Sequence, residues 1–153
     1  MRIRKILNPN DVLLLLPVIY TWRDSCSGIE MDIDMDEATY VGGLQKLVEG
    51  EESDLYILED DKGVYGYMGM TTFNSPLGRQ KIANEHHWYV IPEKRGVSAL
   101  RFIPLAQKWA REKECSHLIM SASNLASELH DNVCEIYKRF GMKKFETSYI
   151  KRV

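Results

Sequence analysis

Apolar residues recur along the chain with two different periods, and the changes of period mark the predicted elements. Segments that alternate apolar and polar residues, or that are short and rich in aliphatic and aromatic residues, indicate strands. Segments whose apolar residues fall every three to four positions indicate helices. The predicted strands are residues 1–7, 54–60, 63–73, 81–91, 117–122 and 143–153. The predicted helices are residues 8–22, 34–48, 98–114 and 125–140.

The order of these elements is β-α-α-β-β-β-α-β-α-β, which predicts an α/β (α+β) fold in one domain that spans residues 1–153. Turn residues at 60–63 and 74–78 join three consecutive strands, so these strands are expected to pair antiparallel. The strand, helix and strand at 83–122 form a crossover unit, which implies one parallel pair. The prediction is therefore a mixed, mostly antiparallel twisted sheet flanked by helices.

The first two predicted helices carry recognisable start and stop signals. Asn10 or Asp11 is a plausible N-cap of the first helix, and Pro17 is expected to end or kink it. Asp34 precedes Glu37 by three residues, which is the spacing of a capping box and predicts the start of the second helix there.

The last two predicted helices are also bounded by residues with a structural role. Pro104 lies inside the helix at 98–114 and is expected to kink it, because proline lacks the backbone N–H that the helix needs. Asn124 is expected to cap the final helix. Gly141 is expected to end it, since glycine readily adopts the left-handed backbone conformation found after helices.

Composition and charge exclude several classes of protein. The chain has 153 residues, 44% of them hydrophobic, and a net charge of -2 that offers no general attraction to nucleic acid. Its three cysteines, Cys26, Cys115 and Cys134, have no CxxC spacing, which fits a reducing cytoplasm. The apolar run at 12–20 contains a proline and is too short to span a bilayer, so no membrane association and a cytoplasmic location are expected.

A basic turn separates the strand at 81–91 from the helix at 98–114. A helix N-terminus presents unpaired backbone N–H groups and partial positive charge, and phosphate is its commonest ligand. A glycine lets the backbone approach such a ligand closely, and basic side chains add charge. The turn supplies these parts in Lys94, Arg95, Gly96 and Ser98. It is either a phosphate site or a solvated surface turn with a helix cap.

The segment YVIPEKRG, taken with the order of elements, resembles the GNAT superfamily of N-acetyltransferases. In that family a strand ending in V-x-P-E-x-R-G leads into a loop of pattern [Q/R]-x-x-G-x-[G/A], which binds the pyrophosphate of acetyl-CoA. EIYKRFGMKKF is similar to the closing stretch of the family, a tyrosine on the last helix followed by glycine and an apolar residue. The segment E-x-x-W-Y-V-x-P-E-x-R-G also resembles short members from bacteriophage genomes.

The resemblance places the pyrophosphate loop at Arg95 to Leu100. Ser98 stands where the family has glycine and Leu100 where it has a small residue, so Gly96 is expected to supply the turn and Ala99 the small residue in a shifted register. The implied donors to the thioester oxygen are backbone N–H groups near Tyr89 to Ile91. The full implied set of acetyl-CoA-binding residues is Tyr89, Val90, Ile91, Lys94, Arg95, Gly96, Val97, Ser98, Ala99 and Asn124.

Acetyl transfer to an amine benefits from a general base and a general acid. The resemblance implies Glu85 as the base, with His86 and His87 as alternatives, since an imidazole titrates near neutral pH. Strand alternation puts Glu85 and His87 on one face and His86 on the other, unless a bulge intervenes. Tyr137 matches the usual acid of the family, although its place on the apolar stripe of its helix fits a core residue equally well.

The resemblance implies acetyl-CoA as co-substrate, a primary amine on a small molecule or protein as acceptor, and direct attack in a ternary complex. A homodimer is possible, and no metal site is expected, since residues 32–43 lack the glycine and glutamate of a calcium loop. The acidic stretch at 30–37 either borders the acceptor cleft or is a capped, solvated helix start. A non-catalytic relative that binds CoA or protein remains the alternative.

Overall fold

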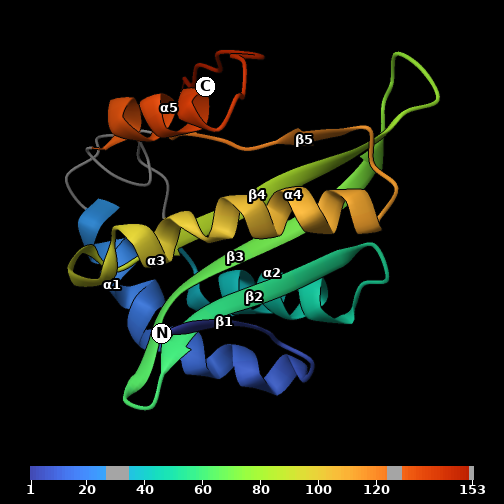
Figure 1. Ribbon diagram of the computed structural model, residues 1–153. Helices are drawn as coiled ribbons and strands as arrows, with labels where there is room; N and C mark the ends of the chain where they lie inside the picture. The colour runs from blue at the N-terminus through green and yellow to red at the C-terminus, as the bar shows by residue number, and fades with distance from the viewer. Residues whose placement is uncertain (27–34, 124–128, 152–153) are drawn as a thin grey trace.

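Five strands form one mixed sheet in the order β1-β2-β3-β4-β5 (Figure 1). The computed structural model describes residues 1–26, 35–123 and 129–151. Within them the strands are β1 Arg2–Lys5, β2 Ser53–Asp60, β3 Gly63–Asn74, β4 Lys81–Val90 and β5 His117–Ile119. The first four pair antiparallel with their neighbours, and β5 pairs parallel with β4. This is the predicted mixed, mostly antiparallel sheet with one parallel crossover.

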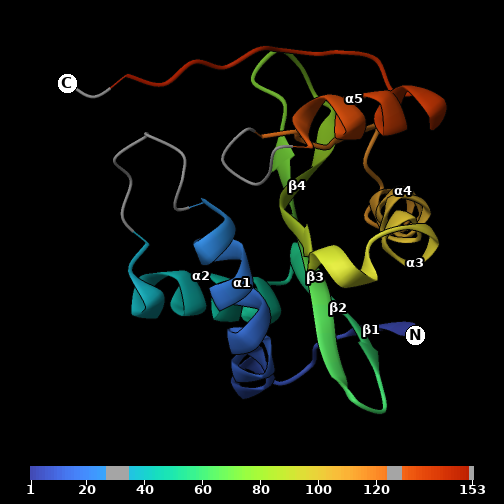
Figure 2. The ribbon, with the colours of Figure 1, turned by 90° about the vertical axis from the view of Figure 1, so that its left-hand side faces the viewer.

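Helices cover both faces of this sheet (Figure 2). The helical elements are η1 Pro9–Leu15, α1 Leu16–Cys26, α2 Glu37–Glu49, η2 Pro92–Lys94, α3 Val97–Leu100, α4 Phe102–Glu112 and α5 His130–Arg139, of which η1 and η2 are 3-10 helices. Helices α1 and α2 lie on one face, and α3, α4 and α5 lie on the other. In the described residues, no helix is both long enough and apolar enough to pass through a membrane.

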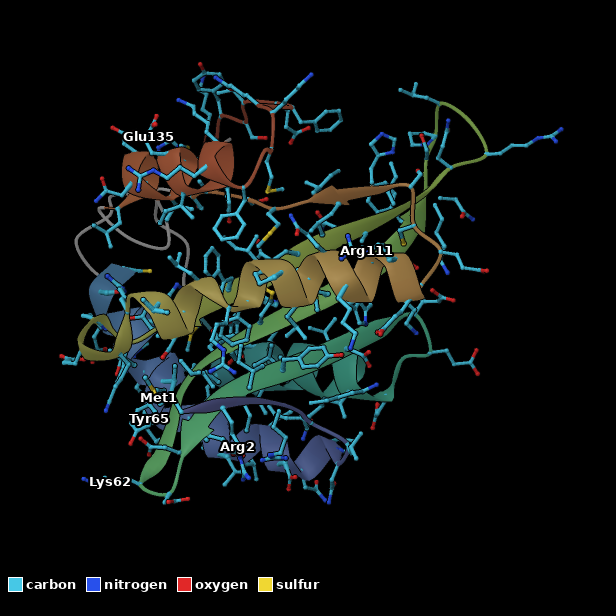
Figure 3. All side chains as sticks on the ribbon, in the orientation of Figure 1. Met1, Arg2, Lys62, Tyr65, Arg111 and Glu135 are labelled. Carbon is cyan, nitrogen blue, oxygen red and sulfur yellow. The ribbon has the colours of Figure 1, made fainter. Side chains whose placement is uncertain are left out.

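Each face of the sheet carries its own apolar core. Leu44 of α2 and Tyr67 of β3 belong to the core under α1 and α2, whereas Met68 and Phe102 belong to the core under α4. Side chains fill the space between the sheet and α4 (Figure 3). Burial of such side chains contributes on the order of 1.5–3 kcal/mol each. Tyr67 and Met68, which are successive residues of β3, serve opposite cores, so a side chain of the sheet can be assigned to a face by the core that it joins.

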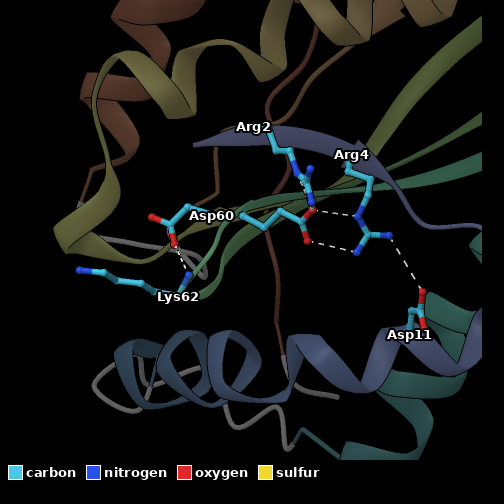
Figure 4. Close-up of polar contacts among 6 residues, drawn as sticks. Arg2, Arg4, Asp11, Asp60 and Lys62 are labelled. Atoms are coloured by element: carbon cyan, nitrogen blue, oxygen red, sulfur yellow. Dashed lines mark hydrogen bonds and ion pairs between the residues drawn. The ribbon is translucent and has the colours of Figure 1, made fainter.

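The edge strand β1 is fixed to β2 by charge as well as by backbone pairing. Glu59, which is only 8% exposed, accepts hydrogen bonds from Arg2 and Arg4 (Figure 4). Both arginines lower the pKa of the Glu59 carboxyl, and Arg4 has the larger effect. The carboxylate thus remains charged in a position that would otherwise favour its neutral form.

The first helix begins earlier than the sequence predicted. Asn8, and not Asn10 or Asp11, is the N-cap, and its side chain accepts a hydrogen bond from the Asn10 backbone N–H. Pro17 does not end the helix, because it is the second residue of α1, where a backbone N–H would have no partner within that helix. The conformation changes instead just before the proline, from η1 to α1.

Two further helix starts differ in detail from the predictions. Asp36 caps α2 by accepting a hydrogen bond from the Thr39 N–H at 2.7 Å, and Asp34 of the predicted capping box lies outside the described residues. The helix predicted at 98–114 is divided at Arg101 into α3 and α4. This break comes three residues before Pro104, whose ring leaves no room for a continuous preceding turn.

The C-terminal region contains one clear correction. Helix α5 ends as predicted before Gly141, whose φ is 78°, while the predicted cap Asn124 lies outside the described residues. The strand predicted at 143–153 is wrong over its described part, since residues 143–151 join no sheet. The segment leads away from α5 towards the C-terminus (Figure 2). It pairs with no strand of the described residues, and Tyr149 is 94% exposed. Local alternation cannot supply that missing partner.

Candidate active site

The candidate site lies where β4 and β5 separate. Their parallel pairing covers only three residue pairs, and the last is Asn84 with Ile119. At the next position the Glu85 carboxylate accepts a hydrogen bond from the backbone N–H of Ser121 at 3.1 Å. Beyond Asn84 the described part of the chain gives β4 no strand partner on its β5 side. Backbone groups of β4 beyond Asn84 therefore lack a strand partner on this side within the described residues, and a ligand is one way to satisfy them.

A bulge in β4 decides which way its polar side chains point. Met70 is opposite Glu85 and Gly69 is opposite His87, which leaves His86 as the extra residue. Glu85 therefore shares the α4 face with Met70, whereas His87 faces α2 and contacts Tyr40. Simple alternation, with Glu85 and His87 on one face, does not hold here, and the bulge is the reason.

Glu85 is a buried carboxyl whose proton affinity suits acid–base chemistry. It is 5% exposed, and burial raises its pKa from 4.5 to about 7, an effect that the Ser121 N–H partly opposes. Near neutral pH the group is therefore divided between its two protonation states. A carboxyl with this property beside an open strand edge is a candidate general base.

Tyr137 reaches the same point from α5. Its hydroxyl donates to the backbone carbonyl of Ser121 at 3.0 Å, so Ser121 lies between Glu85 and Tyr137. Burial, followed by the nearby Glu85 carboxyl, raises the Tyr137 pKa far above 10, so the phenol keeps its proton at neutral pH. The Tyr137 ring also lies 6.1 Å from the Trp88 ring.

Trp88 provides an independent sign of a binding site. Its Nε1 atom is buried and has no hydrogen-bond partner among the described residues. A buried donor without a partner costs about 1–3 kcal/mol, so such donors usually meet a ligand or a water. The atom belongs to a residue on the same face of β4 as Glu85.

The basic turn has the backbone of an anion site. Gly96 has φ 112° and precedes α3, whose first backbone bond runs from Leu100 N–H to Gly96 O at 3.1 Å. The N–H groups of Val97, Ser98 and Ala99 therefore precede the first hydrogen bond of the helix and have no partner within it. Adding a Cβ at Gly96 would meet no atom within 4 Å, so the glycine serves backbone conformation and not close packing.

The two basic side chains of the turn contact the neighbouring strands. Arg95 Nε donates to the Val90 carbonyl at 3.0 Å, and Lys94 Nζ lies 4.5 Å from the centre of the Tyr65 ring. Both charged groups therefore lie next to the turn, where they contact β3 and β4. Backbone N–H groups are left as the main recognition elements.

The remaining predicted residues serve mainly as support. Val90 and Ala99 pack in the core under α4, and Ile91 packs against the other core. Tyr89 is 5% exposed, and its hydroxyl has no partner among the described residues. Asn124 lies outside those residues, so the prediction for it stays a prediction.

Sequence reasoning missed Ser121, Tyr40 and Tyr67. Ser121 acts through its backbone, which no side-chain motif reveals. Tyr40 of α2 contacts both His87 and Tyr67 of β3, and these contacts form only in the folded chain. In the described ranges no group of three histidine, cysteine or acidic side chains gathers as a metal site would require.

Glu85 should make stability depend on pH. A pKa raised from 4.5 to about 7 means that the folded state binds the proton more tightly, so stability falls as pH rises between these values. Glu85→Gln removes this effect. The free energy of unfolding of the variant, measured relative to the parent, should be about 2 kcal/mol higher at pH 8 than at pH 5.

Chemical denaturation at both pH values measures this difference. Glu59→Gln is the matched control, because the pKa of Glu59 is lowered, mainly by Arg4, so this carboxyl is charged at both pH values and the stability of the variant relative to the parent should be nearly the same at pH 5 and pH 8. A Glu85→Gln variant whose stability relative to the parent is the same at pH 5 and pH 8 would mean that the carboxyl is not destabilised by burial.

Solved structures show which fold this arrangement belongs to. The chain matches the ribosomal-protein-alanine N-acetyltransferase of Brucella melitensis with a TM-score of 0.71 and 16% identity, over 100% of both chains. It matches an aminoglycoside acetyltransferase from an uncultured soil metagenomic sample with a TM-score of 0.72 and 13% identity, over 100% of this chain and 99% of the other.

A GNAT family acetyltransferase of Staphylococcus aureus matches with a TM-score of 0.67 and 14% identity, over 99% of this chain and 98% of the other. No family model matches the sequence, and neither does any curated protein. The chain thus has the GNAT fold, as its sequence predicted. Its sequence is only 13% to 16% identical to the sequences of these three structures.

Proposed function

We propose that this protein transfers an acetyl group from acetyl-CoA to a primary amine by direct attack in a ternary complex. The observation that carries the proposal is the convergence of Glu85 and Tyr137 on Ser121, at the point where β4 and β5 separate. Glu85 can accept a proton near neutral pH, and the Tyr137 hydroxyl keeps a proton that it can donate.

The proposed reaction balances with these two groups. The amine nitrogen forms a bond to the thioester carbonyl carbon, and the carbon–sulfur bond breaks. Glu85 takes the proton that the amine loses, and Tyr137 gives its proton to the leaving thiolate. Of the backbone N–H groups near Tyr89 to Ile91, that of Ile91 is already bonded to the Tyr65 carbonyl at 2.9 Å. An N–H group on the open side of β4 therefore stabilises the charge that develops on the carbonyl oxygen.

The residues present fit acetyl-CoA as the co-substrate. The N–H groups at 97–99 and the positive φ of Gly96 suit its pyrophosphate. The unpartnered Trp88 Nε1 can donate to a carbonyl of a chain that enters between β4 and β5. Tyr137 lies on the same side of β4, next to Trp88, which suits the sulfur end of the molecule.

Thiol release from acetyl-CoA, measured against a panel of primary amines, tests the proposed activity. Calorimetry of acetyl-CoA binding on the same preparation separates the two steps. Tight binding without turnover of any amine would favour the alternative, a protein of the same fold that binds CoA without catalysis. Absence of both binding and turnover would overturn the proposal.

Gly96→Asp should weaken acetyl-CoA binding at least about tenfold. The change puts a negative charge where the pyrophosphate should lie, and it forces a side chain onto a φ of 112°. Calorimetry measures the affinity. Gly63→Asp is the matched control, since it adds the same charge at another positive-φ glycine, in the β2–β3 turn. Equal affinity in the two variants would place the pyrophosphate elsewhere.

A further inference from the structure

Three side chains on the α2 face of β4 form a hydrogen-bonded chain. Tyr40 OH lies 2.6 Å from Tyr67 OH and 3.2 Å from His87 Nδ1. The Trp22 ring stacks on the Tyr40 ring with centroids 5.2 Å apart, which holds Tyr40 in place.

The burial of Tyr67 fixes the direction of the protons in this chain. Tyr67 is 1% exposed, and in the described part of the protein its hydroxyl has Tyr40 OH as its one partner. If Tyr40 donated to Tyr67, the Tyr67 proton would have no acceptor, at a cost of about 1–3 kcal/mol. Tyr67 therefore donates to Tyr40, and Tyr40 donates to His87.

This direction fixes the tautomer of His87. Its Nδ1 accepts the Tyr40 proton and so carries none, which places the ring proton on Nε2. Burial lowers the His87 pKa to about 4, so the ring is neutral at physiological pH. His87 thus presents a donor at Nε2, and no hydrogen bond of Nε2 is found among the described residues.

A second polar group on the same face also lacks a partner. Tyr89 lies two residues after His87 and packs in the core under α1 and α2, and its buried hydroxyl has no partner in the described residues. Within the described residues, two hydrogen-bonding groups on one face of β4 therefore have no protein partner, and the Tyr89 hydroxyl is the buried one of the two. A ligand with oxygen acceptors would satisfy both.

We infer that His87, held by Tyr40 and Tyr67 as an Nε2–H donor, binds an oxygen of the amine substrate. The inference rests on the proposed function, because it names the acceptor class of that same site. The substrate is an amine that also carries a carbonyl or hydroxyl oxygen. Simple alkyl amines and polyamines lack that oxygen. His87 is accordingly a specificity-determining donor, whereas Glu85, on the opposite face of the strand, is the base.

The tautomer can be measured without any activity. In the ¹⁵N-labelled protein at pH 7, two-bond ¹H–¹⁵N correlation spectra should give His87 a protonated Nε2 and an unprotonated Nδ1. Tyr40→Phe removes the donor to Nδ1, so His87 should then show a mixture of tautomers. Tyr65→Phe, which removes a hydroxyl bonded to Asp60 in another part of the sheet, is the matched control and should leave His87 unchanged. A protonated Nδ1 in the parent would overturn the inference.

Two pairs of amines test the bound oxygen. Alaninamide is compared with isopropylamine, and glucosamine with cyclohexylamine, each titrated into the protein in the presence of CoA. At least one oxygen-bearing amine should shift the His87 Nε2 resonances, and its oxygen-free partner should not. Equal shifts within both pairs, or no shift from any of the four amines, would overturn the inference.

Steady-state kinetics separate this inference from the proposed function. With an oxygen-bearing amine that is turned over, His87→Phe should raise the KM for the amine about tenfold, the size of effect expected for the loss of one hydrogen bond, and leave acetyl-CoA affinity unchanged. His87→Gln, whose amide can donate from a similar position, should restore part of this loss. If acetyl transfer proceeds normally in His87→Phe, the proposed function stands and the inference about His87 fails.

Discussion

Glu85→Gln is expected to slow acetyl transfer roughly 10²–10⁴-fold, the usual contribution of a general acid–base group. Glutamine keeps the shape of the side chain and still accepts the hydrogen bond from the Ser121 N–H. What it loses is the ability to accept a proton. Acetyl-CoA affinity should therefore stay within a factor of about three of the parent, because the rate effect belongs to the chemical step.

The pH dependence of kcat/KM gives this prediction its sharpest test. The parent rate should rise as Glu85 loses its proton and level off above its pKa of about 7. The variant should lack this rise. Glu93→Gln is the control, since it removes an exposed carboxyl of η2 near the basic turn and should leave the profile unchanged. A Glu85→Gln rate within about threefold of the parent from pH 6 to pH 9 would remove Glu85 from the mechanism.

Much of the fold could be predicted because its signals are local. The hairpin between β2 and β3 follows from the turn at 60–63, and the parallel pairing of β5 follows from the strand–helix–strand order at 83–122. The basic turn was found for the same reason, since a strand end, a glycine and a helix start are adjacent in sequence.

The arrangement of the site could not be predicted because it depends on contacts between distant segments. The bulge that separates Glu85 from His87 arises in the pairing of β4 with β3, and neither strand encodes it alone. Ser121 joins Glu85 to Tyr137 through its backbone, which has no residue signature. The strand expected at 143–153 failed for a related reason, because strand formation requires a partner that the alternation of Phe145 and Tyr149 does not specify.

The structure distinguishes between the three candidate bases that the sequence alone could not separate. The sequence offered Glu85, His86 and His87 as possible bases. His86 is exposed, with its Nε2 within 2.7 Å of the Thr71 hydroxyl, and His87 Nδ1 receives the Tyr40 proton under the inferred direction. Glu85 is then the group of the three that combines burial, a pKa near 7 and a place at the open strand edge.

Tyr137→Phe is expected to reduce turnover roughly 10²-fold while the protein folds and binds acetyl-CoA almost as the parent does. The variant loses one oxygen and keeps the ring packed beside Trp88. Its stability should fall by about 1 kcal/mol, the worth of the hydrogen bond to the Ser121 carbonyl. Melting temperature and turnover measured on one preparation separate the chemical effect from the structural one.

The leaving group provides the decisive comparison for Tyr137. A thioester whose thiol is more acidic than that of CoA leaves without much help, so the deficit of Tyr137→Phe should shrink with it if the hydroxyl protonates the thiolate. Tyr149→Phe, which removes a hydroxyl from a side chain that is 94% exposed, is the matched control and should keep the parent rate with both thioesters. A Tyr137→Phe deficit of the same size with both thioesters would assign the tyrosine to positioning. Full activity would leave Tyr137 as a core residue, because its hydroxyl would then serve only the bond to Ser121.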